Sequence, residues 1–326
     1  IVKEKSQIVL KKIKRRFNKE LNTNLNKRYE AFDKFQKEHF KVSREYKNWG
    51  ELTKGCSEYS SVLVGSDQLW LPSNIAGDYY TLSFVPDKIN KISYATSFGV
   101  SNIAKRQREV VSKFLGRINY LSAREETGQK IIKDLTGREA QLVCDPALLL
   151  TAEEWDEDTT PGRLIEEKYI FCYFMGNNLW QREFVEELKR KTGYKIVALL
   201  HLDQYIKADE EYVDYAPFDI SPTDFINLVK NSEMVCTDSF HGTVFSLIYS
   251  KQFFTFMRFS DKATLSTNSR ITTLLKCIGV EDRLVCQKTD LESLLNSKMD
   301  IDGIQSRISK FRSASLHYLK NALEGK

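Results

Sequence analysis

Short apolar runs alternate with longer amphipathic stretches along most of the chain. The apolar runs predict β-strands at 62–64, 92–95, 120–123, 141–144, 169–174, 194–200, 234–237 and 253–257. The amphipathic stretches predict helices near 103–117, 125–135, 178–190, 268–278 and 304–323, with a further helix opened by Ser221 as N-cap and Pro222 at its first position. Strands that alternate with helices imply right-handed βαβ crossovers and parallel sheets.

The first 48 residues differ from this pattern and predict two amphipathic helices. The first has an apolar residue at every fourth position, and the second carries three phenylalanines: Val9, Ile13, Phe17 and Leu21, then Phe32, Phe35 and Phe40. Residues 1–54 hold sixteen Lys or Arg against seven Asp or Glu, in a chain of net charge +5. The densest run, Lys11 to Arg16, is either a solvated helix face or a surface for an anionic membrane or lipid-phosphate acceptor. Nucleic acid is not expected as a partner, because no recognition module accompanies the charge.

An acidic, turn-rich stretch at 153–162 interrupts the alternation, which then restarts. We therefore expect two Rossmann-like α/β domains, 1–150 and 151–326, facing across a cleft, with a closing C-terminal helix. At 41% hydrophobic and 29% charged residues, the composition is typical of a globular protein. No N-terminal stretch has the charged, apolar and cleavage regions of a signal peptide, and no apolar run approaches the roughly 20 residues that span a bilayer, so neither is expected. Its six cysteines form no CxxC pair, so we expect reduced core thiols in a cytoplasmic protein and no metal site.

Ligands of open α/β sheets bind beyond the carboxyl ends of the strands. The most informative such segment is Thr237-Asp238-Ser239-Phe240-His241-Gly242-Thr243, which leaves a buried-type strand and enters a helix. The helix N-terminus favours a phosphate or carboxylate, and Gly242 and the hydroxyls of Ser239 and Thr243 can assist its binding. His241 can hold an anion or move a proton, whereas the structural alternative is a capping or core histidine.

Arginines follow other strands. Arg124 can grip a phosphate or carboxylate bidentately, or it can pair with Glu125 or Glu126. Arg258 follows a later strand and Arg270 opens a helix, so a small polyanion would meet more than one cation.

The turn at 65–70 offers two further candidates, Asp67 to orient or deprotonate a sugar hydroxyl and Trp70 to stack on a sugar face. Their structural alternatives are a helix-capping Asp and a core Trp. Asp145-Pro146 indicates a strand end beside the domain linker.

The chain contains no P-loop, GxGxxG, HExxH or GxSxG motif. ATP-dependent phosphoryl transfer, dinucleotide redox chemistry, zinc proteolysis and serine hydrolysis therefore lack sequence support.

Six ordered segments together resemble the polysaccharide pyruvyl transferase family. They are Val64 to Trp70, Ser93 to Gly99, Ser122 to Glu125, Cys144 to Leu150, Thr237 to Gly242, and Asn268-Ser269-Arg270 with Asp282-Arg283. The resemblance implies a GT-B-like fold of two Rossmann-type domains. It also implies transfer of a pyruvyl group from phosphoenolpyruvate to two hydroxyls of one sugar, in exopolysaccharide biosynthesis. Relative to the family pattern, the first strand–loop–helix unit is missing, so the N-terminal sheet is expected to be one strand short.

On this resemblance the N-terminal domain is the acceptor side and the C-terminal domain is the donor side. His241 is the expected acid/base. The expected donor-binding residues are Arg124, Ser239, Gly242, Thr243, Arg258, Asn268 and Arg270, and the expected acceptor-binding residues are Ser66, Asp67, Trp70 and Ser97. The expected acceptor is a sugar or a lipid-linked oligosaccharide, and no cofactor is expected. The protein is expected in the cytoplasm, with association at the inner membrane face as a further expectation. Two alternatives stay open, a GT-B glycosyltransferase that uses a nucleotide sugar and a non-catalytic glycan-binding or scaffold protein.

Overall fold

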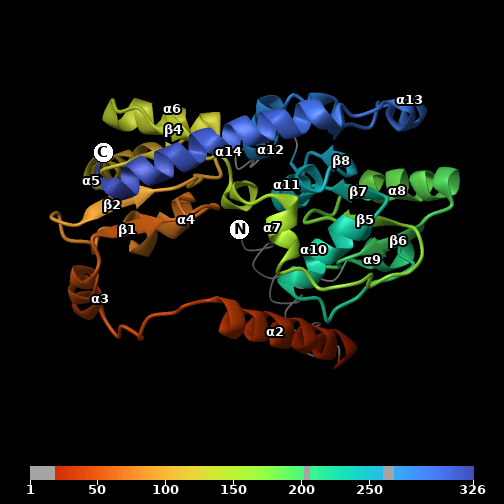
Figure 1. Cartoon of the computed structure of the whole chain (residues 1–326), viewed down its shortest axis with the longest axis horizontal. Helices are drawn as coiled ribbons and strands as arrows, with labels where there is room; N and C mark the ends of the chain where they lie inside the picture. The colour runs from red at the N-terminus through yellow and green to blue at the C-terminus, as the bar shows by residue number, and fades with distance from the viewer. Residues whose placement is uncertain (1–18, 76, 202–205, 260–267) are drawn as a thin grey trace. The chain divides into compact units, whose positions relative to one another are not determined.

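The computed structural model of the chain describes residues 19–75, 77–201, 206–259 and 268–326 (Figure 1). It divides into two compact units. Unit 1 contains the described residues up to Val42 together with Ala152–Arg258 and Asp282–Met299. Unit 2 contains Ser43–Thr151, Phe259–Glu281 and Asp300–Lys326.

The units are discontinuous in sequence, which differs from the expected continuous domains 1–150 and 151–326. Side-chain contacts give the physical reason. The C-terminal helix α14 (Ile301–Glu324) belongs to unit 2, where Ser315 accepts a hydrogen bond from the Cys144 N–H (2.9 Å) and Tyr318 donates to the Ser93 carbonyl (2.9 Å). The N-terminal helix α2 (Lys19–His39) belongs to unit 1, where Arg28 Nε donates to the Phe218 carbonyl (2.7 Å).

Unit 1 is built on a five-stranded sheet in the order β6-β5-β7-β8-β9, and all of its strand pairs are parallel. The strands are β5 (Tyr169–Tyr173), β6 (Lys195–Ala198), β7 (Met234–Thr237), β8 (Gln252–Phe256) and β9 (Leu284–Val285). The central strands β5, β7 and β8 are buried over nearly their whole length, as expected for a parallel sheet that is covered on both faces.

Four helices in the described part of unit 1 connect these strands, namely α8 (Leu179–Thr192), α9 (Lys207–Glu211), α10 (Pro222–Asn231) and α11 (Phe240–Ile248). Helices α2 and α7 (Ala152–Asp156) precede the first strand, and α13 (Leu291–Asn296) follows the last. The predicted start of α10 is confirmed: Ser221 is the N-cap, Pro222 opens the helix, and Asp224 completes a capping box. This capping box satisfies backbone N–H groups that would otherwise be unpaired at the start of α10.

Unit 2 has two parallel strand pairs, β1 (Ser61–Val64) with β2 (Asn90–Ser93) and β3 (Ser122–Ala123) with β4 (Gln141–Leu142). Single bridges, Ile92 to Tyr120 and Thr96 to Ala123, link the two pairs. Its α-helices are α3 (Trp49–Gly55), α4 (Pro72–Ile75), α5 (Arg108–Arg117), α6 (Glu126–Thr136), α12 (Ser269–Ile278) and α14. Both units therefore follow the predicted α/β pattern with parallel strands.

Most predicted elements are confirmed, with shifted ends. The helix predicted from residue 103 is the α-helix α5 only from Arg108, preceded by a 3₁₀ turn at Lys105–Gln107. The strand predicted over 141–144 is only Gln141–Leu142. The first predicted helix and the basic run Lys11 to Arg16 lie outside the described residues. None of the helices in the described part of the chain is both long and apolar enough to cross a bilayer.

Candidate functional site

A polar cluster lies where the strands of unit 2 end. Ser66 and Asp67 follow β1, Ser97 follows β2, Arg124 follows β3 and Asp145 follows β4. Because the carboxyl ends of parallel strands meet at one edge, four separate segments converge there. We call these five residues the strand-end cluster.

Arg124 is the centre of the strand-end cluster. Its Nη1 lies 2.6 Å from Asp145 Oδ2 and 3.2 Å from Ser66 Oγ, and its Nη2 lies 3.2 Å from Asp67 Oδ1. Ser66 also donates to Asp145 Oδ2 (2.8 Å). The Arg124 and Asp145 side chains are 1% and 3% exposed, so this is a buried ion pair. Arg124 therefore forms ion pairs with Asp145 and Asp67, which is the kind of contact that the structural alternative described with Glu125 or Glu126.

Sequence reasoning missed Asp145, which appeared only as a strand end. The structure gives it two tasks. Oδ1 accepts from the Ala147 N–H (3.1 Å) and caps the 3₁₀ turn Pro146–Leu149, while Oδ2 pairs with Arg124. The Asp-Pro pattern predicts the cap, but the partner 21 residues earlier gives no local signal.

Asp67 forms the exposed end of the strand-end cluster. Its side chain is 58% exposed and pairs with Arg124, while Arg270 Nη1 of α12 lies 3.8 Å from the same Oδ1. The backbone of Asp67 is left-handed (φ 74°), a conformation that aspartate adopts more readily than most residues other than glycine, and its carbonyl accepts from the Ser97 N–H (2.9 Å). The sharp turn thus presents a carboxylate outward with two cations beside it.

Glu125 is buried behind Ser97, which donates to its Oε1 (2.9 Å). Burial raises the pKa of this carboxyl, against the opposing influence of Arg124, of the Ser97 hydroxyl and of Arg270. The folded protein therefore binds the Glu125 proton more tightly than the unfolded chain does.

This raised pKa predicts a pH-dependent stability. The favourable contribution is complete below the unfolded glutamate pKa of about 4.3 and is lost as pH rises through the folded-state pKa. Glu125→Gln should remove that loss, so its Tm relative to the wild type should increase with pH when both are measured by calorimetry across this window. The exposed neighbour variant Glu126→Gln is the control. A Tm difference that is constant with pH would contradict the assignment.

Two predicted ligand residues of unit 2 have structural contacts instead. Trp70, predicted to stack on a sugar, is fully buried: its indole N–H donates to the Tyr80 carbonyl (2.9 Å), and its ring packs against Phe98 and Phe114. Asn268 is buried and exchanges hydrogen bonds with the Phe259 backbone (2.7 and 3.4 Å). The alternative of a core tryptophan is therefore the correct one for Trp70.

In unit 1, the predicted motif lies at the junction of β7 and α11. The helix begins at Phe240, one residue before His241, because Ser239 is its N-cap and accepts from the Gly242 N–H (3.4 Å). The Thr243 N–H bonds to the Ser239 carbonyl (3.1 Å). The N–H groups of Gly242 and Thr243 are thus used within the helix, which corrects the expectation that they serve an anion.

Gly242 and Thr243 are also buried against the sheet. A Cβ on Gly242 would lie 2.4 Å from the Thr237 hydroxyl oxygen, so the glycine permits close packing of α11 on β7. The Thr243 hydroxyl lies 2.8 Å from that of Thr255 on β8. The glycine's predicted role of admitting a ligand is replaced by one of packing.

Asp238 connects two strand-end loops of unit 1. Its carboxylate accepts from the N–H groups of Met175 (2.6 Å) and Gly176 (2.9 Å), which follow β5. Arg258, after β8, donates to the Asp238 carbonyl (3.3 Å) and has Nε 3.8 Å from its carboxylate. The Arg258 side chain is 23% exposed, so this predicted donor-binding cation is partly open to solvent at the carboxyl end of β8.

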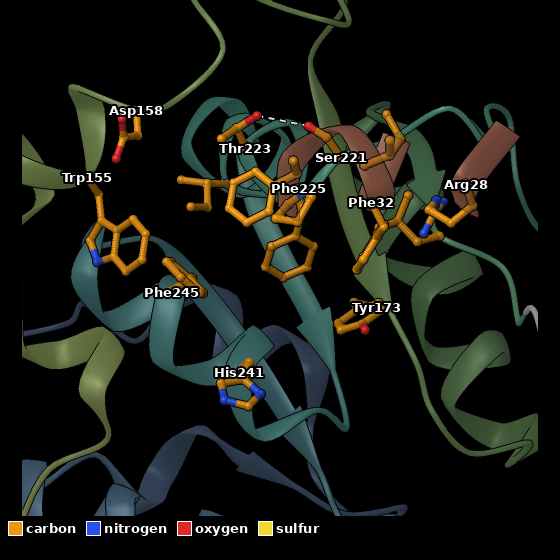
Figure 2. A pocket seen from close by; sticks show the side chains of 15 residues that line it. Arg28, Phe32, Trp155, Asp158, Tyr173, Ser221, Thr223, Phe225, His241 and Phe245 are labelled. Carbon is orange, nitrogen blue, oxygen red and sulfur yellow. Dashed lines mark hydrogen bonds between the residues drawn. The ribbon is translucent and has the colours of Figure 1, made fainter. Parts of the chain in front are cut away.

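His241 lines a cavity of about 300 Å³ within unit 1 (Figure 2). Six aromatic side chains from five elements line it: Phe32 and Phe35 of α2, Trp155 of α7, Tyr173 of β5, Phe225 of α10 and Phe245 of α11. We call this the aromatic cavity. Arg28 of α2 also lines it, and sequence reasoning missed this residue within the generally basic N-terminal region.

A second buried ionic group supports the loop after β5. Asp209 pairs with Arg182 (2.6 Å) and with His201 Nδ1 (2.5 Å), and Arg182 donates to the Gly176 carbonyl (2.8 Å). Asp209 offsets the effect of burial and raises the pKa of His201. In the described ranges, no three His, Cys, Asp or Glu side chains are grouped so that they can hold a metal ion.

Most of these motifs lie within a match to a known protein family. The family model "Polysaccharide pyruvyl transferase" matches residues 4–258. The chain belongs to this family. The comparison with curated proteins found no match.

Solved structures support the fold of this pyruvyl transferase family member. A Listeria monocytogenes protein assigned as a UDP-N-acetylglucosamine 2-epimerase is 13% identical, with 87% of this chain and 82% of that chain covered and a TM-score of 0.51. The MnaA–UDP structure from S. aureus is also 13% identical, covering 90% and 87%, with a TM-score of 0.50. Likeness at this identity shows the fold alone, a GT-B-like α/β fold with parallel sheets.

Proposed function

We propose that this family member transfers the pyruvyl group of phosphoenolpyruvate onto two hydroxyls of one sugar, in a polysaccharide or its lipid-linked precursor. The observation that carries the proposal is the position of His241, which stands in the family motif, at the start of α11, and lines the aromatic cavity. An imidazole beside a cavity is suited to general acid/base catalysis.

The reaction balances without an external oxidant or reductant. A proton adds to the alkene CH₂ of phosphoenolpyruvate, and one sugar hydroxyl oxygen bonds to the resulting cationic carbon. The C–O bond to phosphate breaks, the second hydroxyl closes the ketal, and the two hydroxyl protons are released. In this scheme His241 protonates the donor or the leaving phosphate and regains a proton from a sugar hydroxyl.

The contacts separate the remaining predicted residues into those proposed to bind the donor and those that support Asp67. Arg258 is the donor-binding cation that we propose in unit 1, and the N-cap Ser239 fixes the start of α11 in the same unit. Arg124 supports Asp67 through their ion pair, and Ser66 and Ser97 hold the same turn, which supports Asp67 as a candidate for contact with a sugar hydroxyl within unit 2.

Thermal unfolding with candidate donors tests this proposal. Phosphoenolpyruvate at 100 times its Kd should stabilise the protein by about 2.7 kcal/mol, whereas UDP-sugars at the same concentration should have a smaller effect. Inorganic phosphate is the control for simple anion binding. Stabilisation by a UDP-sugar and not by phosphoenolpyruvate would instead support a GT-B glycosyltransferase, and no shift with either would support a non-catalytic protein.

A further inference from the structure

The wall of the aromatic cavity is continuous. The rings of Trp155 and Phe245 lie 5.2 Å apart, Phe245 and Phe225 5.8 Å, and Phe225 and Tyr173 5.1 Å, all between centroids. Figure 2 shows Phe245, Phe225 and Tyr173 following one another between Trp155 and Arg28. Edge-to-face packing of this kind holds each ring in place, so the apolar wall is formed before a ligand arrives.

Arg28 places a buried positive charge on this wall. The residue is 7% exposed, and its Nε and Nη2 donate to the carbonyls of Phe218 (2.7 Å) and Pro217 (3.2 Å). In the part of the chain that the structure describes, Arg28 forms no contact ion pair with a carboxylate. Burial lowers the Arg28 pKa, whereas Tyr173 and the carboxylates of Asp219 and Asp224 raise it by electrostatic attraction without contacting the guanidinium. An anionic ligand group would supply a counter-charge in direct contact.

We propose that the aromatic cavity binds a phosphorylated pyranose, with the sugar ring against the aromatic wall and the phosphate on Arg28. A cavity of about 300 Å³ is at the small end of ligand sites, which suits one sugar unit. The C–H face of a pyranose packs on aromatic rings, and a guanidinium binds phosphate through charge-assisted hydrogen bonds. This inference rests on the proposed function, because it makes the cavity the acceptor site beside His241.

The donor fits this cavity less well than a sugar phosphate does. Phosphoenolpyruvate carries two anionic groups on a small alkene, whereas the cavity wall has one buried arginine, His241 and the carboxylate of Asp158 beside six aromatic side chains. A ligand with one anionic group and an apolar ring face matches both features. The phosphate can belong to a free sugar phosphate, a nucleotide sugar or a lipid-linked sugar, and these sources share the same chemistry at Arg28.

Calorimetric titration without donor tests the proposal. The probes are the 1-phosphates of glucose, galactose, mannose and N-acetylglucosamine, with the four parent sugars and inorganic phosphate as controls. At least one sugar phosphate should bind saturably at millimolar concentration or below, and its parent sugar should bind at least tenfold more weakly. Arg28→Gln should weaken sugar phosphate binding by tenfold or more, since it removes the charge, whereas Lys34→Gln on the exposed face of α2 should not.

A second variant tests the wall separately from α2, whose attachment includes the Arg28 hydrogen bonds. Trp155→Leu should weaken the sugar phosphate and the parent sugar by a similar factor and leave inorganic phosphate binding unchanged. Titration with a UDP-sugar and with a short polyprenyl pyrophosphate sugar then identifies the source of the phosphate by the tighter ligand.

The outcomes separate this inference from the proposed function. No saturable binding of any sugar phosphate, or equal binding of the parent sugars, would overturn the cavity assignment. Arg28→Gln weakening phosphoenolpyruvate instead would also overturn it and leave pyruvyl transfer standing, with the cavity as the donor site. Arg28-dependent sugar phosphate binding in a protein that does not bind phosphoenolpyruvate would support the cavity and contradict pyruvyl transfer.

Discussion

Replacement of His241 by alanine is expected to lower kcat by roughly 10²–10⁴, with a much smaller change in KM for phosphoenolpyruvate. The proposed proton transfers occur in the transition state, so losing the imidazole should affect turnover more than binding. Phosphate release in the presence of acceptor measures both constants. Because His241 lies on the wall of a cavity, its removal should change the Tm little.

The matched control for this variant is His317→Ala, which removes an exposed histidine on α14 that hydrogen-bonds to Asn321 (2.9 Å). It should keep the wild-type kcat. Wild-type turnover by His241→Ala, or unfolding of that variant, would return His241 to the alternative of a structural histidine at the helix start.

Arg124→Ala is expected to destabilise the fold by about 3–5 kcal/mol, the usual cost of leaving a buried charge without its partner. The Asp145 carboxylate, only 3% exposed, would lose its contact at 2.6 Å. The sequence allowed either a ligand-binding role or an ion pair for Arg124, and the burial of the pair with Asp145 gives Arg124 a role in stability. Urea unfolding followed by circular dichroism gives the free energy of unfolding.

A surface pair provides the control. Arg117 bonds Asp87, whose side chain is 87% exposed, but also two backbone carbonyls, so the matched variant is Asp87→Asn. Exposed ion pairs contribute little to stability, so this change should cost little. Arg124→Ala combined with Asp145→Asn should recover part of the lost stability, because the buried charge is then removed. If Arg124→Ala is no less stable than Asp87→Asn, the pair does not stabilise unit 2.

Local patterns predicted the fold well. The N-cap Ser221, Pro222 and Asp224 lie within four residues, and their capping box formed as the sequence indicated. The alternation of apolar and amphipathic stretches likewise located the parallel strands of both units. These features depend on neighbours in sequence, for which spacing is a direct physical signal.

The candidate site was harder to predict because its contacts are distant in sequence. Ser66 and Asp145 are 79 residues apart, and Arg28 and Phe218 are 190 apart. A single sequence gives no register for such pairs, so Asp145 and Arg28 were missed. Trp70 shows the converse problem, since the same local sequence fits a core indole and a sugar-stacking one, and only its burial decides.

The discontinuity of the units has a consequence for synthesis on the ribosome. Domains usually fold as units while the chain emerges from its N-terminal end, at about 5–20 residues per second. Unit 1 here includes Asp282–Met299 and unit 2 includes Asp300–Lys326. The hydrogen bond from the Cys144 N–H to Ser315 and that from Tyr318 to the Ser93 carbonyl can form only after α14 has been translated. Neither core can therefore close early in translation, and the nascent chain carries partly exposed sheets until its last helices arrive.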